Sequence, residues 1–142
     1  MNVRQFFSVI LIFTLLPLTG QADSDTEVGV IEKLDEYIPM DVQLVNEEGE
    51  EVIIGDLIDK PTILNFVYFR CPGICSPLMD GLADVIDRTD LVLGEDYQAL
   101  TISFDHREGT ILANRKKNNY LNLMEKKEQA EEGWQFFNGD SA

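Results

Sequence analysis

The chain has 142 residues, of which 44% are hydrophobic and 26% are charged, and its formal net charge at pH 7 is −15. This length allows one domain with a single hydrophobic core and is too short for two. The strongly negative charge argues against binding to nucleic acid or to an anionic membrane surface, because both would repel the protein.

The first 22 residues have the three parts of an export signal. Arg4 supplies a positive charge, residues 6–16 form an apolar stretch, and Gly20-Gln21-Ala22 is a small-x-small cleavage site. The apolar stretch is short for a membrane span, and an uncleaved N-terminal membrane tether is the alternative interpretation. We therefore predict a signal peptide over residues 1–22, a folded domain over residues 23–142, and export to the periplasm or the outer face of the cytoplasmic membrane.

A β-hairpin is predicted near the start of the folded domain. Residues 42–45 and 51–54 are rich in residues that favour strands, and a short polar segment separates them. Gly49 in that segment supplies the positive φ angle that a tight turn requires.

The two cysteines lie between a predicted strand and a predicted helix. Residues 62–69 form a short, continuously apolar run, which predicts a strand that is buried on both faces. Apolar residues then recur at helical spacing and predict an amphipathic helix that begins at Ser76 and buries Leu78, Leu82, Val85 and Ile86. Cys71 and Cys75 therefore lie at a strand–helix junction, where free backbone N–H groups and the helix dipole favour the thiolate form.

Two more strands and one more helix are predicted in the second half of the chain. Residues 97–104 predict a core strand, Thr110 is expected to cap a helix that continues to about Met124, and residues 133–137 predict a third parallel strand. The segment between that helix and that strand, residues 125–132, is expected to be a charged loop or a frayed helix end. This order predicts an α/β fold with a mainly parallel sheet that lacks its C-terminal elements.

Cys71 and Cys75 are spaced so that they can act as a pair. At the start of a helix, the spacing Cys-x3-Cys separates the two residues by about one turn of roughly 3.6 residues, so both sulfurs can face one point. Two thiolates are soft donors that prefer Cu(I) or zinc to hard cations. They can also form a disulfide, although such a small loop gains little stability from one. The residues alone leave both kinds of chemistry open.

His106 is the only histidine in the chain, and it follows the predicted strand 97–104. Ligands of parallel sheets gather at the carboxyl edge, which is also where the cysteines are expected. His106 is thus in a position to approach a metal held by Cys71 and Cys75, whereas the simpler interpretation is a surface loop residue. Asp105 beside it is expected to be a turn residue.

Several segments resemble the Sco/SenC family. They are Ile38-Pro-Met-Asp, the cysteine segment Tyr68-Phe-Arg-Cys-Pro-Gly-Ile-Cys, Leu100-Thr-Ile-Ser-Phe-Asp, Asn119-Tyr-Leu and Gly133-Trp-Gln-Phe-Phe-Asn-Gly-Asp. The resemblance covers nearly all of the chain after the predicted signal, and it implies a thioredoxin-like fold. It further implies a metallochaperone that binds copper, as Cu(I) or Cu(II), through Cys71 and Cys75. The implied partner is the copper-accepting subunit of cytochrome c oxidase, whose dinuclear copper centre the family helps to assemble.

Two features depart from the family pattern. The family's ligand histidine lies downstream, in a region that this chain does not contain, and His106 stands where the family usually has proline. Two thiolates alone would form an incomplete copper site, which raises the hypothesis that His106 is a substitute ligand.

The alternative function is that of a thiol–disulfide oxidoreductase acting on the cysteines of a copper-receiving partner. A thioredoxin-like fold supports this interpretation, although the spacing Cys-x3-Cys differs from the Cys-x2-Cys that is usual in such enzymes. No catalytic residue is predicted, because the sequence contains neither a phosphate-binding loop nor a Ser/His/Asp arrangement.

Overall fold

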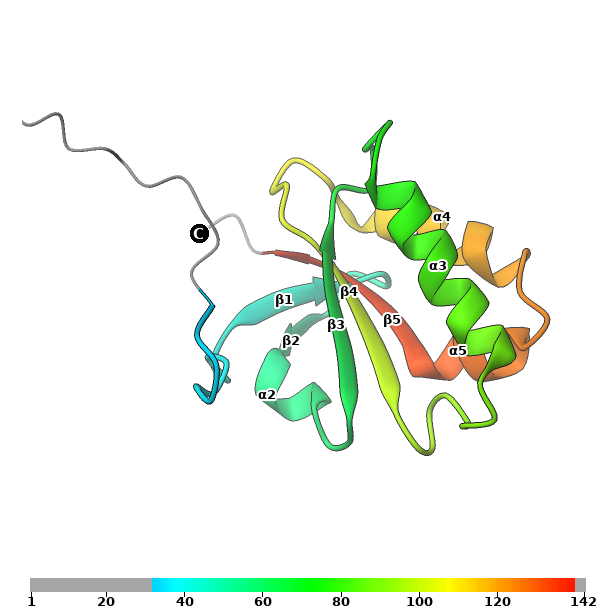
Figure 1. Ribbon diagram of the computed structural model, residues 1–142. Coiled ribbons are helices and arrows are strands. Elements are labelled where there is room, and N and C mark those ends of the chain that lie inside the picture. Colours follow the sequence, from blue (N-terminus) through cyan, green and yellow to red (C-terminus); the bar gives the residue numbers. More distant parts are fainter. Residues whose placement is uncertain (1–31, 140–142) are drawn as a thin grey trace, which may run out of the picture. The chain divides into compact units, whose positions relative to one another are not determined.

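A five-stranded sheet organises the fold, with the strand order β2-β1-β5-β4-β3 (Figure 1). The computed structural model describes residues 32–139, and the sheet and its helices belong to the unit that begins at Glu36. The signal peptide predicted for residues 1–22 lies outside the described residues. Within the described part, no helix is long and apolar enough to cross a membrane.

The predicted N-terminal hairpin is confirmed. It consists of β1 (Gln43–Asn46) and β2 (Glu51–Ile53), which pair antiparallel. Gly49 in the turn has a φ angle of 92°, a conformation that glycine adopts without strain. β1 also pairs antiparallel with β5 (Trp134–Gly139), and this second pairing joins the hairpin to the rest of the sheet.

Three parallel strands form the other part of the sheet, as predicted. β3 (Thr62–Val67) pairs with β4 (Gln98–Ser103), and β4 pairs with β5. All six residues of β4 are buried, because this strand has a neighbour on each side and lies under packed side chains. Among the described residues β3 is the last strand of the sheet, and exposed side chains on one of its faces show that the prediction that residues 62–69 are buried on both faces is wrong. Phe66, for example, is 55% exposed.

Three helices cover one face of the sheet: α3 (Cys75–Arg88), α4 (Thr110–Leu121) and α5 (Lys127–Gly133) (Figure 1). The segment 125–132, which was expected to be a loop or a frayed end, thus contains most of a separate short helix. Thr110 is the first residue of α4 and not its cap, because Gly109 takes the cap position without a side-chain hydrogen bond.

The buried face of α3 agrees only in part with the predicted one, since Ile86 is buried and Leu82 packs against the core, but the other two predicted residues do neither. Met79 and Ile86 are buried, whereas Leu78 and Val85 are 51% and 55% exposed. The helix begins one residue earlier than expected, at Cys75. The buried residues Cys75, Met79 and Ile86 recur at helical spacing and form the stripe that faces the sheet. The apolar pattern alone did not distinguish between these two neighbouring stripes.

The opposite face of the sheet has a smaller cover. The short helix α2 (Ile54–Leu57) packs there, and the buried cluster on this side contains Leu44, Ile54, Leu100, Ile102 and Phe137. Toward the carboxyl ends of β3 and β4, three aromatic residues of this face remain exposed: Phe66, Tyr68 and Phe104. Among residues 32–139, one face of the sheet is therefore a closed core, and the other is only partly covered.

Candidate metal centre

Both cysteines lie in the segment that leads from the carboxyl end of β3 into α3, so the predicted strand–helix junction is confirmed. Cys75 is the first residue of α3 and is buried, whereas Cys71 is half-buried in the preceding loop. Both are free cysteines. The loop turns back on itself, because the N–H of Cys71 donates to the carbonyl oxygen of Tyr68 at 3.2 Å.

Hydrogen-bond donors surround the sulfur of Cys71. The N–H of Gly73 lies 3.4 Å from this sulfur. The pKa of the Cys71 thiol is lowered from its ordinary value, first by the backbone N–H of Cys75, then by that of Gly73 and by the side chain of Cys75. Each of these donors stabilises the thiolate more than the thiol.

The second thiol behaves in the opposite way. Burial raises the pKa of Cys75, and the nearby charges of Cys71 and Glu108 raise it further, while the N–H of Tyr68, 3.5 Å from the sulfur, lowers it. The two thiols are therefore unequal. The Cys71 thiol therefore ionises at a lower pH than the Cys75 thiol. This arrangement provides a reactive thiolate with a protonated sulfur beside it.

A buried carboxylate, Glu108, holds the segment just before Cys71. Glu108 is only 2% exposed. Its Oε2 accepts hydrogen bonds from the N–H of Phe69 and the hydroxyl of Ser103, both at 2.6 Å, and its Oε1 accepts one from the N–H of Arg70 at 2.8 Å. Such charge-assisted bonds offset the cost of burying a carboxylate. Glu108 therefore links the loop after β4 to the cysteine loop.

Glu108 was not among the residues predicted for the site. It ends the polar run that begins at Asp105, and such a run ordinarily lies on the surface. Only the pairing of β3 with β4 brings Glu108 to Phe69, which is 39 positions away in the chain. The one signal in the sequence was that Glu108 closely follows the predicted strand 97–104, which was expected to end at the same edge of the sheet as the cysteines.

His106 lies in the same loop after β4, and it is exposed. Among residues 32–139, no three His, Cys, Asp or Glu side chains are grouped so that they could hold a metal ion. The structure therefore does not bring His106 to the cysteine pair as a third ligand. Asp105 is a turn residue, as predicted, since its Oδ1 accepts the N–H of Arg107 at 3.0 Å. The Arg107 side chain, through its hydrogen bonds to the carboxylate, also lowers the pKa of Asp105.

Comparison with known proteins agrees with this architecture. The family model described as SCO1/SenC matches residues 32–132. The curated protein SCO1 homolog 1, mitochondrial, of Arabidopsis thaliana is 34% identical over 68 residues, which are 48% of this chain and 20% of that protein.

Two solved structures illustrate the similarity of the fold. A putative electron transfer protein from Aquifex aeolicus VF5 is 26% identical with a TM-score of 0.61, over 72% of this chain and 56% of that chain. ScoI of Arabidopsis thaliana with copper bound is 24% identical with a TM-score of 0.55, over 70% of this chain and 56% of that chain. The chain thus spans little more than half the length of these solved relatives, and its thioredoxin-like fold is confirmed. The chain belongs to the SCO1/SenC family.

Proposed function

We propose that this protein binds copper through Cys71 and Cys75 and transfers it to the copper-accepting subunit of cytochrome c oxidase. The observation that carries this proposal is the position of two free cysteines in the short segment between β3 and the start of α3, each with a backbone N–H directed at its sulfur. Two thiols in one short segment suit two ligands of one metal ion. Paired thiolates are soft donors and suit Cu(I) in particular.

The inequality of the two thiols suits the uptake and release of a metal. Cys71, as the more readily ionised thiol, provides the first donor sulfur. Cys75 must lose its proton before it can act as the second donor, so binding releases a proton and strengthens with rising pH. Two sulfur ligands leave further coordination positions for a donor atom of the receiving protein.

We further propose that the protein works outside the cytoplasm, in the periplasm or at the outer face of the cytoplasmic membrane. Residues 1–22 would serve as a signal peptide or as an N-terminal tether. Fusion of residues 1–22 to a reporter that is active only after export tests this point, and a reporter without activity would contradict it.

The copper proposal is tested by titrating the reduced protein with Cu(I) against a coloured competing chelator. We expect about one copper per chain for the unmodified protein and none for the Cys71→Ala, Cys75→Ala double variant. His106→Ala is the matched control and should bind as the unmodified protein does, since His106 does not join the pair. Absence of binding by the unmodified protein would overturn the proposal.

The second candidate function is disulfide reduction in a copper-receiving partner, and the lowered pKa of Cys71 favours it. The Cys71 thiolate would attack the partner's disulfide and release one partner thiolate. Cys75 would then displace the other, leaving a Cys71–Cys75 disulfide and a reduced partner, and an external dithiol would restore the pair. A disulfide-reduction assay with insulin tests this function independently of copper, and inactivity of the unmodified protein would exclude general reductase activity.

A further inference from the structure

Glu108 carries a negative charge into the interior of the protein. Its side chain is the acceptor in each of the three hydrogen bonds that it forms with described residues, two from backbone N–H groups and one from the hydroxyl of Ser103. The oxygen of that hydroxyl accepts the N–H of Asp105 at 3.3 Å, so its hydrogen is available for Glu108. A carboxyl group that only accepts hydrogen bonds has the pattern of the ionised form.

No cation of the described residues neutralises this charge by direct contact. Arg107, the preceding residue, forms its ion pair with Asp105 at 2.7 Å at the protein surface. Among residues 32–139, no lysine or arginine forms an ion pair with Glu108. Because Glu108 is only 2% exposed, water screens its charge less than that of a surface residue. Its charge can therefore act on groups nearby.

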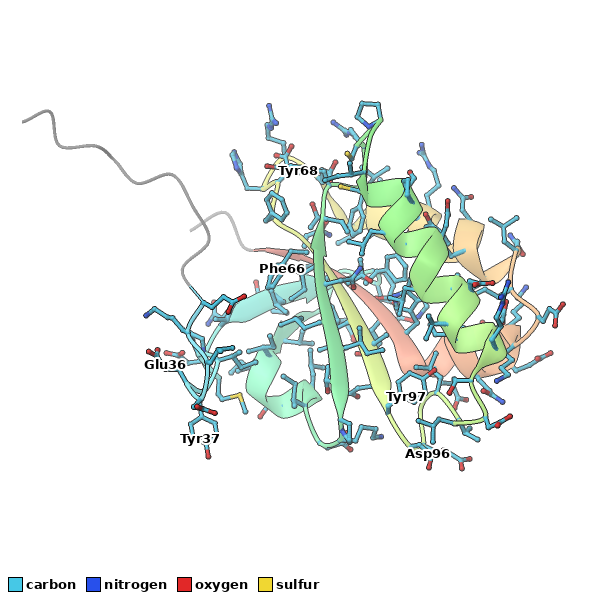
Figure 2. All side chains as sticks on the ribbon, in the orientation of Figure 1. Glu36, Tyr37, Phe66, Tyr68, Asp96 and Tyr97 are labelled. Atoms are coloured by element: carbon cyan, nitrogen blue, oxygen red, sulfur yellow. The ribbon has the colours of Figure 1, made fainter. Side chains whose placement is uncertain are left out.

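The charge lies close to the cysteine pair. Tyr68 follows the end of β3, where the chain leads towards α3 (Figure 2). The N–H of Tyr68 lies 3.5 Å from the sulfur of Cys75. The N–H of the very next residue, Phe69, donates to Glu108 at 2.6 Å. Burial is the first cause of the raised pKa of Cys75, and the charge of Glu108 contributes to it. The carboxylate and this sulfur therefore influence each other.

A fixed negative charge beside two thiolates distinguishes metal ions by their own charge. Two thiolates with a monovalent ion, such as Cu(I) or Ag(I), form a complex that keeps one negative charge. With a divalent ion, such as Cu(II) or Cd(II), the complex is neutral. The fixed charge repels the first complex and leaves the second nearly unaffected. At an effective dielectric constant of about 20, repulsion between unit charges several ångströms apart changes affinity roughly tenfold.

We propose that Glu108 sets how the cysteine pair discriminates between the oxidation states of copper, because its buried charge weakens the binding of Cu(I) relative to Cu(II). This inference rests on the proposed binding of copper by Cys71 and Cys75. A site that holds Cu(I) less tightly passes it on more readily. Glu108 thus promotes the release of Cu(I) in addition to holding the cysteine loop.

The test compares two redox-inert ions, Ag(I) and Cd(II), in competition titrations of the reduced full chain against a chelator of known affinity. Both are soft ions that thiolates bind, and neither oxidises the thiols. Both would use the same two sulfurs, so a variant that merely loosens the cysteine loop weakens both alike. Loss of the buried charge instead changes the ratio of the two dissociation constants.

Three variants separate the charge from the structure. Glu108→Gln removes the charge and nearly keeps the size, and it should tighten the binding of Ag(I) roughly tenfold relative to Cd(II). Glu108→Asp keeps the charge on a shorter side chain and should leave the ratio unchanged. Asp105→Asn removes an exposed charge from the same loop and should also leave it unchanged, because water screens that charge. An unchanged ratio in Glu108→Gln would overturn the proposal, and so would an equal change in Asp105→Asn.

A second neutral variant guards against misfolding of Glu108→Gln. In a Ser103→Ala background, one of the three donors that would compete for the single oxygen of glutamine is absent. The double variant should show the same tenfold change in the ratio, whereas Ser103→Ala alone should show none. A change of equal size in Ser103→Ala alone would overturn the proposal.

The last measurement uses Cu(I) itself. Glu108→Gln should hold Cu(I) roughly tenfold more tightly than Glu108→Asp, since both variants disturb the loop and only the first removes the charge. Equal affinities would overturn the proposal. An unmodified chain that binds Ag(I) and Cd(II) but not Cu(I) would refute the copper function while the charge effect is still measured, so the two failures can be told apart. A chain that binds none of the three ions would overturn both.

Discussion

The two faces of the sheet differ in how far the described residues cover them. Under the helices, Trp134 and Phe136 are fully buried at 0% exposure, and their rings lie 5.2 Å apart between centroids. On the other face, Tyr68 and Phe104 are in similar ring contact but remain 42% and 53% exposed. The same residue types thus stabilise the domain on one face and are available for contact on the other. The difference lies in what covers each face.

The largest effect is expected from Trp134→Ala. This change removes a fully buried side chain and leaves the hydroxyl of Thr101 without the indole N–H that donates to it at 2.8 Å. We expect the free energy of unfolding to fall by about 3–5 kcal/mol. Urea denaturation measures it, and a loss below about 1 kcal/mol would contradict the assignment of this face as the main core.

A smaller loss is expected from Glu108→Gln, which acts between the core and the cysteine loop. In the protein, the N–H groups of Phe69 and Arg70 and the hydroxyl of Ser103 share the two oxygens of the carboxylate, whereas the neutral amide of glutamine offers only one acceptor oxygen. We therefore expect the free energy of unfolding to fall by about 2 kcal/mol in urea denaturation. The change also removes a negative charge near Cys75 and should lower the pKa of that thiol, which the pH dependence of alkylation reports.

Asp105→Asn is the matched control for Glu108→Gln. Its ion pair with Arg107 lies at the surface, so stability should change by less than about 0.5 kcal/mol. Equal losses in the two variants would show that Glu108 does not hold the loop.

Phe104→Ala should have a small effect, because the ring is already 53% exposed. Removal of its contact with Tyr68 is expected to cost about 0.5–1 kcal/mol. The matched variant on the covered face is Phe136→Ala, which should cost about 3–5 kcal/mol. Similar losses in both would remove the distinction between the two faces.

The pH dependence of the cysteines is expected to have the smallest effect on stability. The raised pKa of Cys75 favours the folded protein below the ordinary thiol pKa of 9.0, and this contribution is lost as the pH rises above it. The lowered pKa of Cys71 acts in the opposite sense, so its contribution is lost as the pH falls. The two contributions therefore oppose each other.

Alkylation measures this inequality directly. Iodoacetamide should modify Cys71 first, at a pH below that at which an unperturbed cysteine reacts, and Cys75 only at higher pH. Mass spectrometry after partial reaction identifies the modified residue. Equal rates at the two sulfurs would contradict the inequality of the pair.

The sequence was informative wherever a local pattern decides the structure. The hairpin turn at Gly49, the three parallel strands, and the position of Cys71 and Cys75 between a strand and a helix were all predicted from neighbouring residues. The pattern was less informative about burial. The buried face of α3 was predicted to hold Leu78, Leu82, Val85 and Ile86. Leu78 and Val85 are exposed instead, because two adjacent apolar stripes satisfy the same periodicity.

The sequence by itself therefore determined the order of the five strands and of the two longer helices, the family, and the pair of thiols as the candidate site, but not the short helices α2 and α5. Only the tertiary structure decided that β5 lies between β1 and β4, that Glu108 reaches the cysteine loop, and that, among residues 32–139, His106 does not join the cysteine pair. The physical reason is that hydrogen bonds and side-chain spacing within a few residues create the local patterns. Strand neighbours and the partners of a buried carboxylate depend instead on contacts between residues far apart in the chain.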